Sequence, residues 1–255
     1  MEKLLREGER LDEVNFRLQL IQKINGMTFG TDALLLASFV RPYPNGQAIE
    51  FGSGSGIISL LCASRGKFNH ITAVEIQEEY VDLTKRNIAM NELTNAISVS
   101  HADIRDTKAY LPNQTVHAIF SNPPYMTVSS GYKASDGGRQ AARHEVNGTI
   151  FQFCEAAAKK LRYGGSFYVV WRPDRLTDLI VALREAKLEP KRMTFVAKSV
   201  EYAPSIVLVE ARLGGKSGLI TTPIFYLQNT DGTNTNELEN LLLDGAFPFS
   251  GKEKV

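Results

Sequence analysis

The sequence predicts an α/β fold: a Rossmann-like sheet of seven strands, mainly parallel, with helices between the strands. From about residue 47, short apolar runs alternate with helical patterns of about 10 to 15 residues, which indicates βαβ units. The Gly-rich turn FGSGSG, residues 51–56, joins the first run to the first helix. Only Glu201 to Pro204 separate the last two strand candidates, too few residues for a parallel crossover, so we expect an antiparallel pair there.

Residues 1–46 are predicted to form a small extension that packs on the core. The segment LQLIQKINGMTF, residues 18–29, has two apolar stretches around Asn25-Gly26, and both residues tolerate positive φ, which predicts a hairpin. The following TDALLLASFV predicts an apolar helix. It opens with Thr31 and Asp32, which are good capping residues, and Arg41-Pro42 stops it.

The core, residues 47–213, contains the alternating elements, and residues 214–255 form a C-terminal extension. The predicted strands are QAIEF (47–51), ITAVEI (71–76), AISVSHAD (96–103), VHAIFSN (116–122), SFYVVW (166–171), KRMTFVAKSV (191–200) and PSIVLVEARL (204–213). The predicted helices are SGIISLLCASR (55–65), EEYVDLTKRNIAMN (78–91), RLTDLIVALREAKL (175–188) and EVNGTIFQFCEAAAKKLRYGG (145–165), the last closed by Gly164-Gly165. The extension offers a further strand in GLITTPIFYL and a short helix in NELENLLLDG.

The bulk composition excludes several classes of protein. The formal charge is +1, from 29 basic and 28 acidic residues, so any nucleic-acid surface must be local. Cys62 and Cys154 lie in apolar helical patterns without metal-ligand spacing, which indicates buried free thiols, a reducing compartment and no metal site. No apolar run approaches the roughly 20 residues that span a bilayer. We therefore expect a cytoplasmic protein without membrane contact, of open oligomeric state with a monomer favoured.

The glycine turn and two acidic residues predict a cofactor site. The turn has the spacing GxGxG with Ile57 after it, so the dinucleotide fingerprint GxGxxG is not met. Glu75 ends the second strand, where a carboxylate can accept hydrogen bonds from two ribose hydroxyls, and Asp103 ends the third, where it can accept from an adenine amino group. Ligands of open α/β sheets lie outside the carboxyl ends of the strands, so together these elements favour a nucleoside-type cofactor.

The fourth strand runs into Asn122-Pro123-Pro124-Tyr125, which can hold a planar amine. The side-chain oxygen of Asn122 can accept one N–H and the carbonyl of Pro123 the other, and the rigid Pro-Pro pair keeps both acceptors fixed. Tyr125 can stack on a planar target. This positions an exocyclic nitrogen without requiring a general base, although a Pro-rich turn at a strand end is the simpler structural interpretation.

In combination, these motifs resemble the class I S-adenosylmethionine-dependent methyltransferases, in the branch that methylates amino groups. The resemblance covers residues 47–213 and implies that the enzyme binds S-adenosylmethionine. It implies a role for each matching residue: Glu50 for the methionine amino group; Gly52, Ser53, Gly54 and Gly56 for the methionine part; Glu75 for the ribose; Asp103 for the adenine N6; Ile76 and Ile104 on either side of the adenine ring; and Asn122, Pro123 and Tyr125 for the acceptor amine. Asn122 is expected to contact the cofactor as well.

The N-terminal segment narrows the resemblance. FGTDALLLASF, with NPPY and the later ARHE at 142–145, is similar to the bacterial tRNA1(Val) (adenine-37-N6)-methyltransferase group. That similarity implies tRNA as substrate and places Thr31 beside the cofactor and the target pocket, as a cofactor-binding residue. Asp32 is either a pocket residue or simply a helix cap, and Arg143-His144-Glu145 either close over the substrate or cap the next helix.

Other functions stay open at this point. Release-factor glutamine N5-methyltransferases also carry NPPY but begin with a long helical domain, and only about 46 residues precede the first core strand here. A non-catalytic nucleoside-binding protein is an alternative of another class, and a DNA adenine methylase is disfavoured without a DNA-recognition domain. Between Lys159 and Lys216 twelve Lys/Arg stand against six Asp/Glu, and the loop 126–143 adds Lys133, Arg139 and Arg143, which can serve RNA binding or be ordinary solvated surface.

Overall fold

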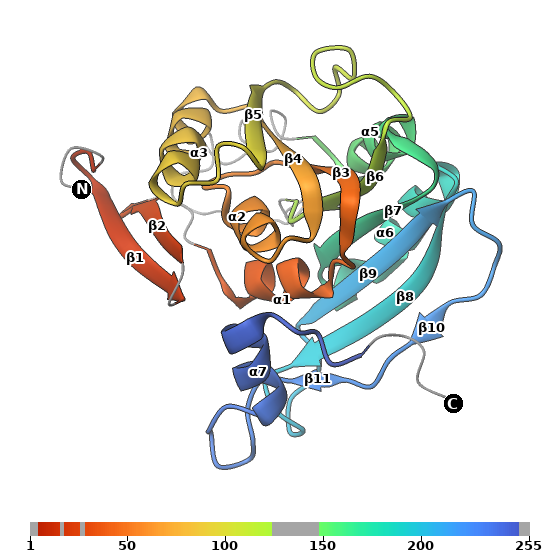
Figure 1. The fold of residues 1–255 in the computed structure, drawn as a ribbon. Coiled ribbons are helices and arrows are strands. Elements are labelled where there is room, and N and C mark those ends of the chain that lie inside the picture. Colours follow the sequence, from red (N-terminus) through yellow and green to blue (C-terminus); the bar gives the residue numbers. More distant parts are fainter. Residues whose placement is uncertain (1–4, 16–17, 26–28, 124–147, 250–255) are drawn as a thin grey trace, which may run out of the picture.

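The computed structural model describes residues 5–15, 18–25, 29–123 and 148–249. Its large sheet contains seven long strands: β3 (Tyr43–Phe51), β4 (Phe68–Glu75), β5 (Ile97–His101), β6 (Val116–Ser121), β7 (Leu161–Trp171), β8 (Leu188–Ala197) and β9 (Ile206–Leu213). Two short strands, β10 (Ile220–Thr221) and β11 (Phe225–Tyr226), both pair with β8. The order is β10-β8-β9-β7-β6-β3-β4-β5 (Figure 1).

Helices cover both faces of this sheet. They are α1 (Thr31–Phe39), α2 (Ile57–Ser64), α3 (Glu78–Met90), α5 (Ile150–Lys160), α6 (Leu176–Glu185) and α7 (Asn236–Asp244), with a 3-10 turn at Pro173–Arg175. The first three lie on one face and α5 and α6 on the other (Figure 1). Successive β7 residues alternate between the two cores, since Tyr168 and Val170 belong to the first, Phe167 and Val169 to the second. The predicted α/β fold, a Rossmann-like sheet with helices between its strands, is therefore confirmed.

The antiparallel ending of the sheet is also confirmed. β9 runs antiparallel to β8 and to β7, while the pairs β3 with β4, β3 with β6, β4 with β5 and β6 with β7 are parallel. The expected additional strand in 218–227 forms as the two short strands that extend the β8 edge. The expected C-terminal helix is α7, whose Leu238 and Leu241 are buried against the α1 side of the core.

The N-terminal hairpin forms, but with another partner strand than the sequence analysis predicted. Leu18–Lys23 is β2, and it pairs with the upstream β1, Glu9–Asn15, instead of with the residues after Asn25. The charged β1 lacks a continuous apolar pattern and was missed for this reason. Its Leu11 packs beside Ile21, and its Glu9 forms an ion pair with Arg86 of α3.

The glycine pair at 164–165 does not close a helix. α5 ends at Lys160, and the pair lies inside β7, where Gly164 has φ +77°. The pairing of β6 with β7 shifts register between Val116 and Ala118, so the glycine adapts the strand to a bulge. Thr149 caps α5 through a capping box with Gln152, so the helix also starts later than predicted.

A buried cation ties the C-terminal segment to the core. Arg192 of β8 is 3% exposed, lies over the Phe39 ring at 3.8 Å and forms an ion pair with Glu210 at 3.0 Å. Its guanidinium also donates to the Phe249 carbonyl at 3.0 Å and to the Phe39 carbonyl. Arg41 reaches the same Glu210 carboxylate at 2.9 Å. A buried charge needs such partners, because an unpaired one would be strongly destabilising.

We expect Asn87→Ala to lower the free energy of unfolding by about 3 kcal/mol, because it strips buried backbone groups of their partners. Asn87 of α3 accepts from Ile21 N at 2.7 Å and donates to Ile21 O at 3.0 Å and to Ser55 O at 2.9 Å, so it joins β2 to the glycine turn. Urea unfolding of the variant measures the loss. The exposed Asn69→Ala should change stability by less than about 0.5 kcal/mol, and equal effects would contradict the assignment.

Candidate active site

The carboxyl ends of β3 and β6 lie side by side at the point where the strand order reverses. Phe51 and Ser121 are register partners at the ends of these parallel strands, and Ser121 Oγ donates to the Phe51 carbonyl at 2.9 Å. From this point β4 and β5 follow on one side, and β7 and β9 on the other. Such a switch point is the usual ligand site of open α/β sheets.

The predicted glycine turn lies at this edge. Gly52, Gly54 and Gly56 have φ of +67°, +55° and +82°, which only glycine adopts without strain. Space is open around Gly52 and Gly54, since a Cβ added at either would meet nothing within 4 Å. Gly56 differs, because an added Cβ would lie 2.8 Å from Thr84 Cγ2, so α3 requires a glycine there. Thr84 Oγ1 also donates to Gly54 O at 2.7 Å and holds the turn.

Two side chains give the turn its polar character. Ser53 is 4% exposed, and its Oγ has no hydrogen-bond partner among the described residues, which is costly for a buried hydroxyl. The carboxylate of Glu75 is also buried and accepts from the backbone N–H groups of Gly54, Ile76 and Gln77, each at 2.9 Å. The structure therefore brings the acid at the end of β4 against the glycine turn.

Glu50 is buried below the turn. It is 1% exposed, and its carboxylate accepts from the Ser59 backbone N at 3.0 Å and from the Ser59 hydroxyl of α2. Burial raises the pKa of Glu50 to about 8; the Ser59 hydrogen bonds oppose this rise and the nearby Glu75 carboxylate adds to it. A cation near this carboxyl would favour its ionised form.

Asp103 follows β5 and forms an ion pair with Arg105. The Arg105 backbone N and Nε donate to its carboxylate at 2.8 Å and 2.9 Å. Partial burial alone would raise the pKa of Asp103, but the hydrogen bonds from Arg105 outweigh it and leave the pKa below its ordinary value. The carboxyl is therefore ionised near neutral pH and can accept further hydrogen bonds. The expected ring contacts, Ile76 and Ile104, directly follow the two acids and are half-buried and buried.

Asn122 contacts a residue from a distant part of the sequence. Its Nδ2 donates to Asp32 Oδ2 of α1 at 2.8 Å, which joins the end of β6 to the start of α1. Pro123, the next residue, is buried. The α1 cap is Gly30, without a side-chain hydrogen bond, so the expectation that Thr31 or Asp32 caps the helix is wrong. Asp32 lies in the first turn, where its Oδ1 accepts from Ala33 N at 2.9 Å.

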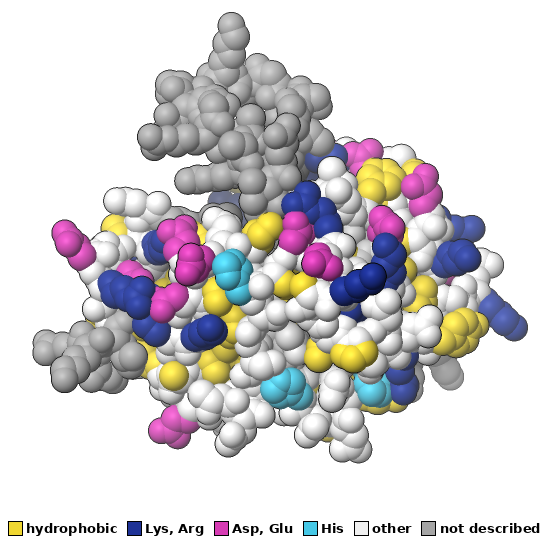
Figure 2. Space-filling view, turned by 90° about the horizontal axis from the view of Figure 1, so that it is seen from above, with side chains coloured by type: hydrophobic (Ala, Val, Ile, Leu, Met, Phe, Trp, Pro, Cys, Tyr) yellow, Lys and Arg dark blue, Asp and Glu magenta, His cyan; other side chains and the backbone are white. Residues whose placement is uncertain are grey.

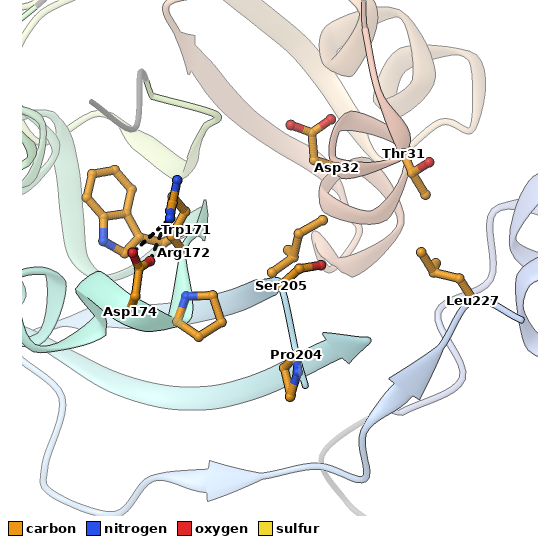
Figure 3. A pocket seen from close by; sticks show the side chains of 10 residues that line it. Thr31, Asp32, Trp171, Arg172, Asp174, Pro204, Ser205 and Leu227 are labelled. Atoms are coloured by element: carbon orange, nitrogen blue, oxygen red, sulfur yellow. Dashed lines mark hydrogen bonds and ion pairs between the residues drawn. The ribbon is translucent and has the colours of Figure 1, made fainter. Parts of the chain in front are cut away.

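A cavity of about 730 Å³ opens beside this contact (Figure 3). The first turn of α1 forms one wall, the residues after β7 form another, and the start of β9 forms a third. The lining residues are Thr31, Asp32, Trp171, Arg172, Pro173, Asp174, Pro204, Ser205, Ile206 and Leu227. Thr31, expected beside the cofactor, lines this cavity, and the glycine-turn residues 52–56 are not among its lining residues. Arg172 and Asp174 pair across the rim at 2.8 Å.

Part of the predicted site lies outside the described residues: Tyr125, the loop basic residues Lys133 and Arg139, and Arg143-His144-Glu145. Conversely, sequence reasoning missed the cavity residues Trp171 and Arg172. Their position at the carboxyl end of the fifth predicted strand was a usable signal. Ser205 and Leu227 had none, because only the tertiary fold brings them to the cavity.

The surface charge is more mixed than the count between Lys159 and Lys216 suggested. Lys160 and Arg192 are buried, and Arg172, Arg175 and Arg184 pair with neighbouring acids. Figure 2 shows Lys and Arg interspersed with Asp and Glu over much of one face, with Lys and Arg prevailing at its right-hand end. Fewer positive side chains are therefore available to a polyanion than the excess of Lys and Arg between residues 159 and 216 suggests.

The described residues contain neither a cluster of metal-ligating side chains nor a candidate membrane helix. Among them, no three His, Cys, Asp or Glu side chains are grouped as metal ligands. In the same residues no helix combines the length and apolar character that a bilayer crossing requires. Cys62 and Cys154 are both free and buried, as predicted.

Comparison with known proteins decides the family. The family model described as methyltransferase small domain matches residues 25–186, more than half of the chain. The chain belongs to the methyltransferase small domain family. The matched residues include both the glycine turn and Asn122, so both parts of the candidate site belong to the family domain.

Curated relatives carry a common name, tRNA1(Val) (adenine(37)-N6)-methyltransferase. The one from Vibrio cholerae is 33% identical over 74% of this chain and 76% of its own length. The one from Porphyromonas gingivalis is 28% identical over 77% and 78%. A third, from Vibrio campbellii, is 30% identical, and the match spans only 48% of its length.

Solved structures show the same fold. A protein described as a predicted O-methyltransferase from Agrobacterium tumefaciens aligns with a TM-score of 0.69 and 20% identity, covering 84% of this chain and 97% of its own. A tRNA m1G37 methyltransferase from M. jannaschii aligns with a TM-score of 0.58 and 16% identity, covering 83% and 56%. At these identities the likeness concerns the fold alone.

The protein is an S-adenosylmethionine-dependent methyltransferase, and its residues fit that cofactor. Open space beside Gly52 and Gly54 admits a ligand close to the backbone, and the unpartnered Ser53 hydroxyl offers a hydrogen bond. The buried carboxyl groups of Glu50 and Glu75 suit a ligand that carries a sulfonium and an ammonium group, because a cation beside Glu50 would favour its ionised form.

We expect Glu50→Gln to remove a pH dependence of stability in the cofactor-free methyltransferase. The folded-state pKa of Glu50, about 8, lies above the ordinary value of 4.5, so between these values the folded state holds a proton that the unfolded chain has released. Stability should therefore fall as pH rises through this window, by on the order of 1 kcal/mol per pH unit.

Urea unfolding at pH 5 and pH 8 measures this fall in the wild type and its loss in Glu50→Gln. Glu185→Gln, which changes an exposed glutamate, serves as the control and should keep the wild-type pH dependence. The same fall in all three proteins would show that another group is responsible.

Proposed function

We propose that this methyltransferase transfers a methyl group from S-adenosylmethionine to the N6 amine of an adenine in tRNA, at a position like adenine-37 of tRNA1(Val). The observation that carries the proposal is the position of Asn122. Asn122 directly follows β6, which lies between β3 and β7 in the sheet. The glycine turn follows β3, and the residues after β7 line the 730 Å³ cavity. Asn122 therefore separates a cofactor side from an acceptor side. Residues 47–213 form the methyl-transfer domain in this proposal, with extensions at 1–46 and 214–255.

On the cofactor side, the proposed contacts follow charge and space. Glu50 and the turn residues Gly52, Ser53, Gly54 and Gly56 hold the methionine part, where the structure has a buried carboxyl group and open space beside Gly52 and Gly54. Glu75 accepts from the ribose hydroxyls. Asp103 accepts from the adenine amino group, with Ile76 and Ile104 against the ring.

On the acceptor side, the residues orient an amine. The bound cofactor supplies an electrophilic methyl group. The Asn122 side-chain oxygen and the Pro123 carbonyl accept the two N–H bonds of the target, which directs its lone pair toward that methyl group. Because both acceptors belong to the strand end, they need no reorganisation during transfer. In this proposal Tyr125 stacks on the target base.

The choice of adenine in tRNA rests on relatives. Those from Vibrio cholerae and Porphyromonas gingivalis, named for this activity, align with about three quarters of the chain. A cavity of this volume accommodates a nucleobase, whose extrusion from its stack costs a few kcal/mol. The proposed site draws all its residues from one chain, so a monomer suffices, and tRNA as substrate is consistent with a cytoplasmic enzyme.

Incubation with labelled S-adenosylmethionine and total tRNA, total DNA or release factor tests the acceptor. We expect label in tRNA, recovered as N6-methyladenosine after nucleoside digestion. Asn122→Ala should lower kcat at least about 100-fold, since it removes an acceptor aimed at the reacting amine, while the Kd of the cofactor stays within about twofold. Label in release factor alone would replace the proposal with glutamine methylation, and an unchanged kcat in Asn122→Ala would refute the mechanism.

Gly54→Ala should raise the Kd of S-adenosylmethionine at least about tenfold, because its methyl group would occupy the open space beside the turn. Gly66→Ala is a matched control. Gly66 also has positive φ, +62°, and open space, but it lies after α2 at the amino end of β4. Both variants carry a backbone strain of about 1 kcal/mol. Equal losses of affinity in calorimetric titrations would mean that strain, and not contact with the cofactor, is responsible.

A further inference from the structure

We propose that Asp32 is a positioning residue that fixes the orientation of the Asn122 amide, so that its oxygen faces the acceptor amine. This inference rests on the proposed role of Asn122 and adds a residue from a different part of the sequence. It follows from the 2.8 Å hydrogen bond between Asn122 Nδ2 and Asp32 Oδ2.

The chemistry of the pair allows only one orientation. A primary amide has an oxygen that accepts and a nitrogen that donates, and the two ends have nearly the same shape. Rotation of the Asn122 side chain by half a turn would therefore present N–H groups to the target amine, and two donors cannot bond to one another. An ionised carboxylate only accepts, so Asp32 bonds the nitrogen end and rejects the oxygen end. Charge assistance makes this hydrogen bond stronger than a neutral one.

The surroundings keep the Asp32 carboxylate in place. Its second oxygen, Oδ1, accepts from Ala33 N at 2.9 Å in the first turn of α1. Gly30 leaves room beside it, because a Cβ added at Gly30 would lie 2.8 Å from Oδ1. Gly30 itself has an ordinary extended backbone, with φ −113° and ψ −177°, so the glycine serves the close approach and not an unusual dihedral angle.

The location of Asp32 agrees with this role. Asp32 lines the cavity proposed for the acceptor, and Figure 3 shows its side chain on the α1 wall of that cavity. Asn122 is half-buried, so its hydrogen bond to Asp32 is partly shielded from water. A helix-stabilising acid would need only the contact with Ala33, whereas the second oxygen reaches a residue 90 positions away.

Exchange of the two side chains tests the inference. Asp32→Asn keeps an oxygen for Ala33 N but also offers a donor, so the Asn122 amide can flip; we expect kcat to fall about tenfold. Asn122→Asp places two carboxylates side by side, which disfavours both charges and should lower kcat at least as much. In the double variant an amide at 32 again donates to a carboxylate at 122, whose other oxygen accepts from the target whichever way it turns.

We therefore expect the double variant to turn over at least about fivefold faster than either single variant, with the Kd of S-adenosylmethionine within about twofold of wild type throughout. Glu237→Gln, which changes an exposed first-turn acid of α7, is the control and should keep the wild-type kcat. A purely structural role of Asp32 predicts no recovery, since each change would add its own loss.

The measurements use whichever acceptor the wild-type protein methylates, so the wild-type reaction with tRNA tests the proposed function and the variant ratios test the inference. An unchanged kcat in Asp32→Asn, or a double variant no faster than the slower single one, would overturn the positioning role. Recovery in the double variant would establish that the pair acts through the orientation of its hydrogen bond.

Discussion

The parallel pairing of β3 with β6 is the constraint on which the rest of the site depends. It sets Phe51 and Ser121 opposite each other, and the Ser121 hydroxyl locks the two strand ends together. The glycine turn leaves one of these ends and Asn122 leaves the other, so a shift of register would separate the two halves of the site. Both strands are buried between helices on the two faces of the sheet. A shift of register would move their apolar side chains out of place, so the packing of the core stabilises this register.

The site contains two carboxyl groups, Glu50 and Glu75, that are buried, where a charge is costly. Burial disfavours ionisation of Glu50 and the nearby Glu75 carboxylate adds to this effect, while hydrogen bonds from Ser59 oppose it. Glu75 itself accepts hydrogen bonds from the backbone of the glycine turn. Apolar residues in place of these glutamates would stabilise the empty protein and remove its attraction for the sulfonium and ammonium groups of the ligand. The site therefore gives up some stability of the empty protein in favour of the ligand, which is common where function requires buried charge.

The sequence was sufficient for features that are local or periodic, and insufficient for those set by distant contacts. The alternation of apolar runs and helices predicted the seven strands, and the short link after Glu201 predicted the antiparallel pair. The sequence did not predict β1, because its charged residues lack an apolar pattern and the strand forms by pairing with β2. The sequence also predicted a helix end at Gly164, where the structure has a bulge in β7. Within the site, the sequence left Asp32 open as a helix cap or a pocket residue, because no local pattern indicates its contact with Asn122. The cavity walls formed by Ser205 and Leu227 have no local sequence pattern either.

The hydrogen bond between Arg192 and the Phe249 carbonyl makes the C-terminal segment part of the protein interior. A main-chain group near the C-terminus completes the set of partners around a cation in the interior. Proteolytic removal of Phe249 would expose the Arg192 guanidinium to water on one side and remove one of its hydrogen-bond acceptors. Loss of the residues from Phe249 onward should thus destabilise β8 and β9 in the middle of the fold.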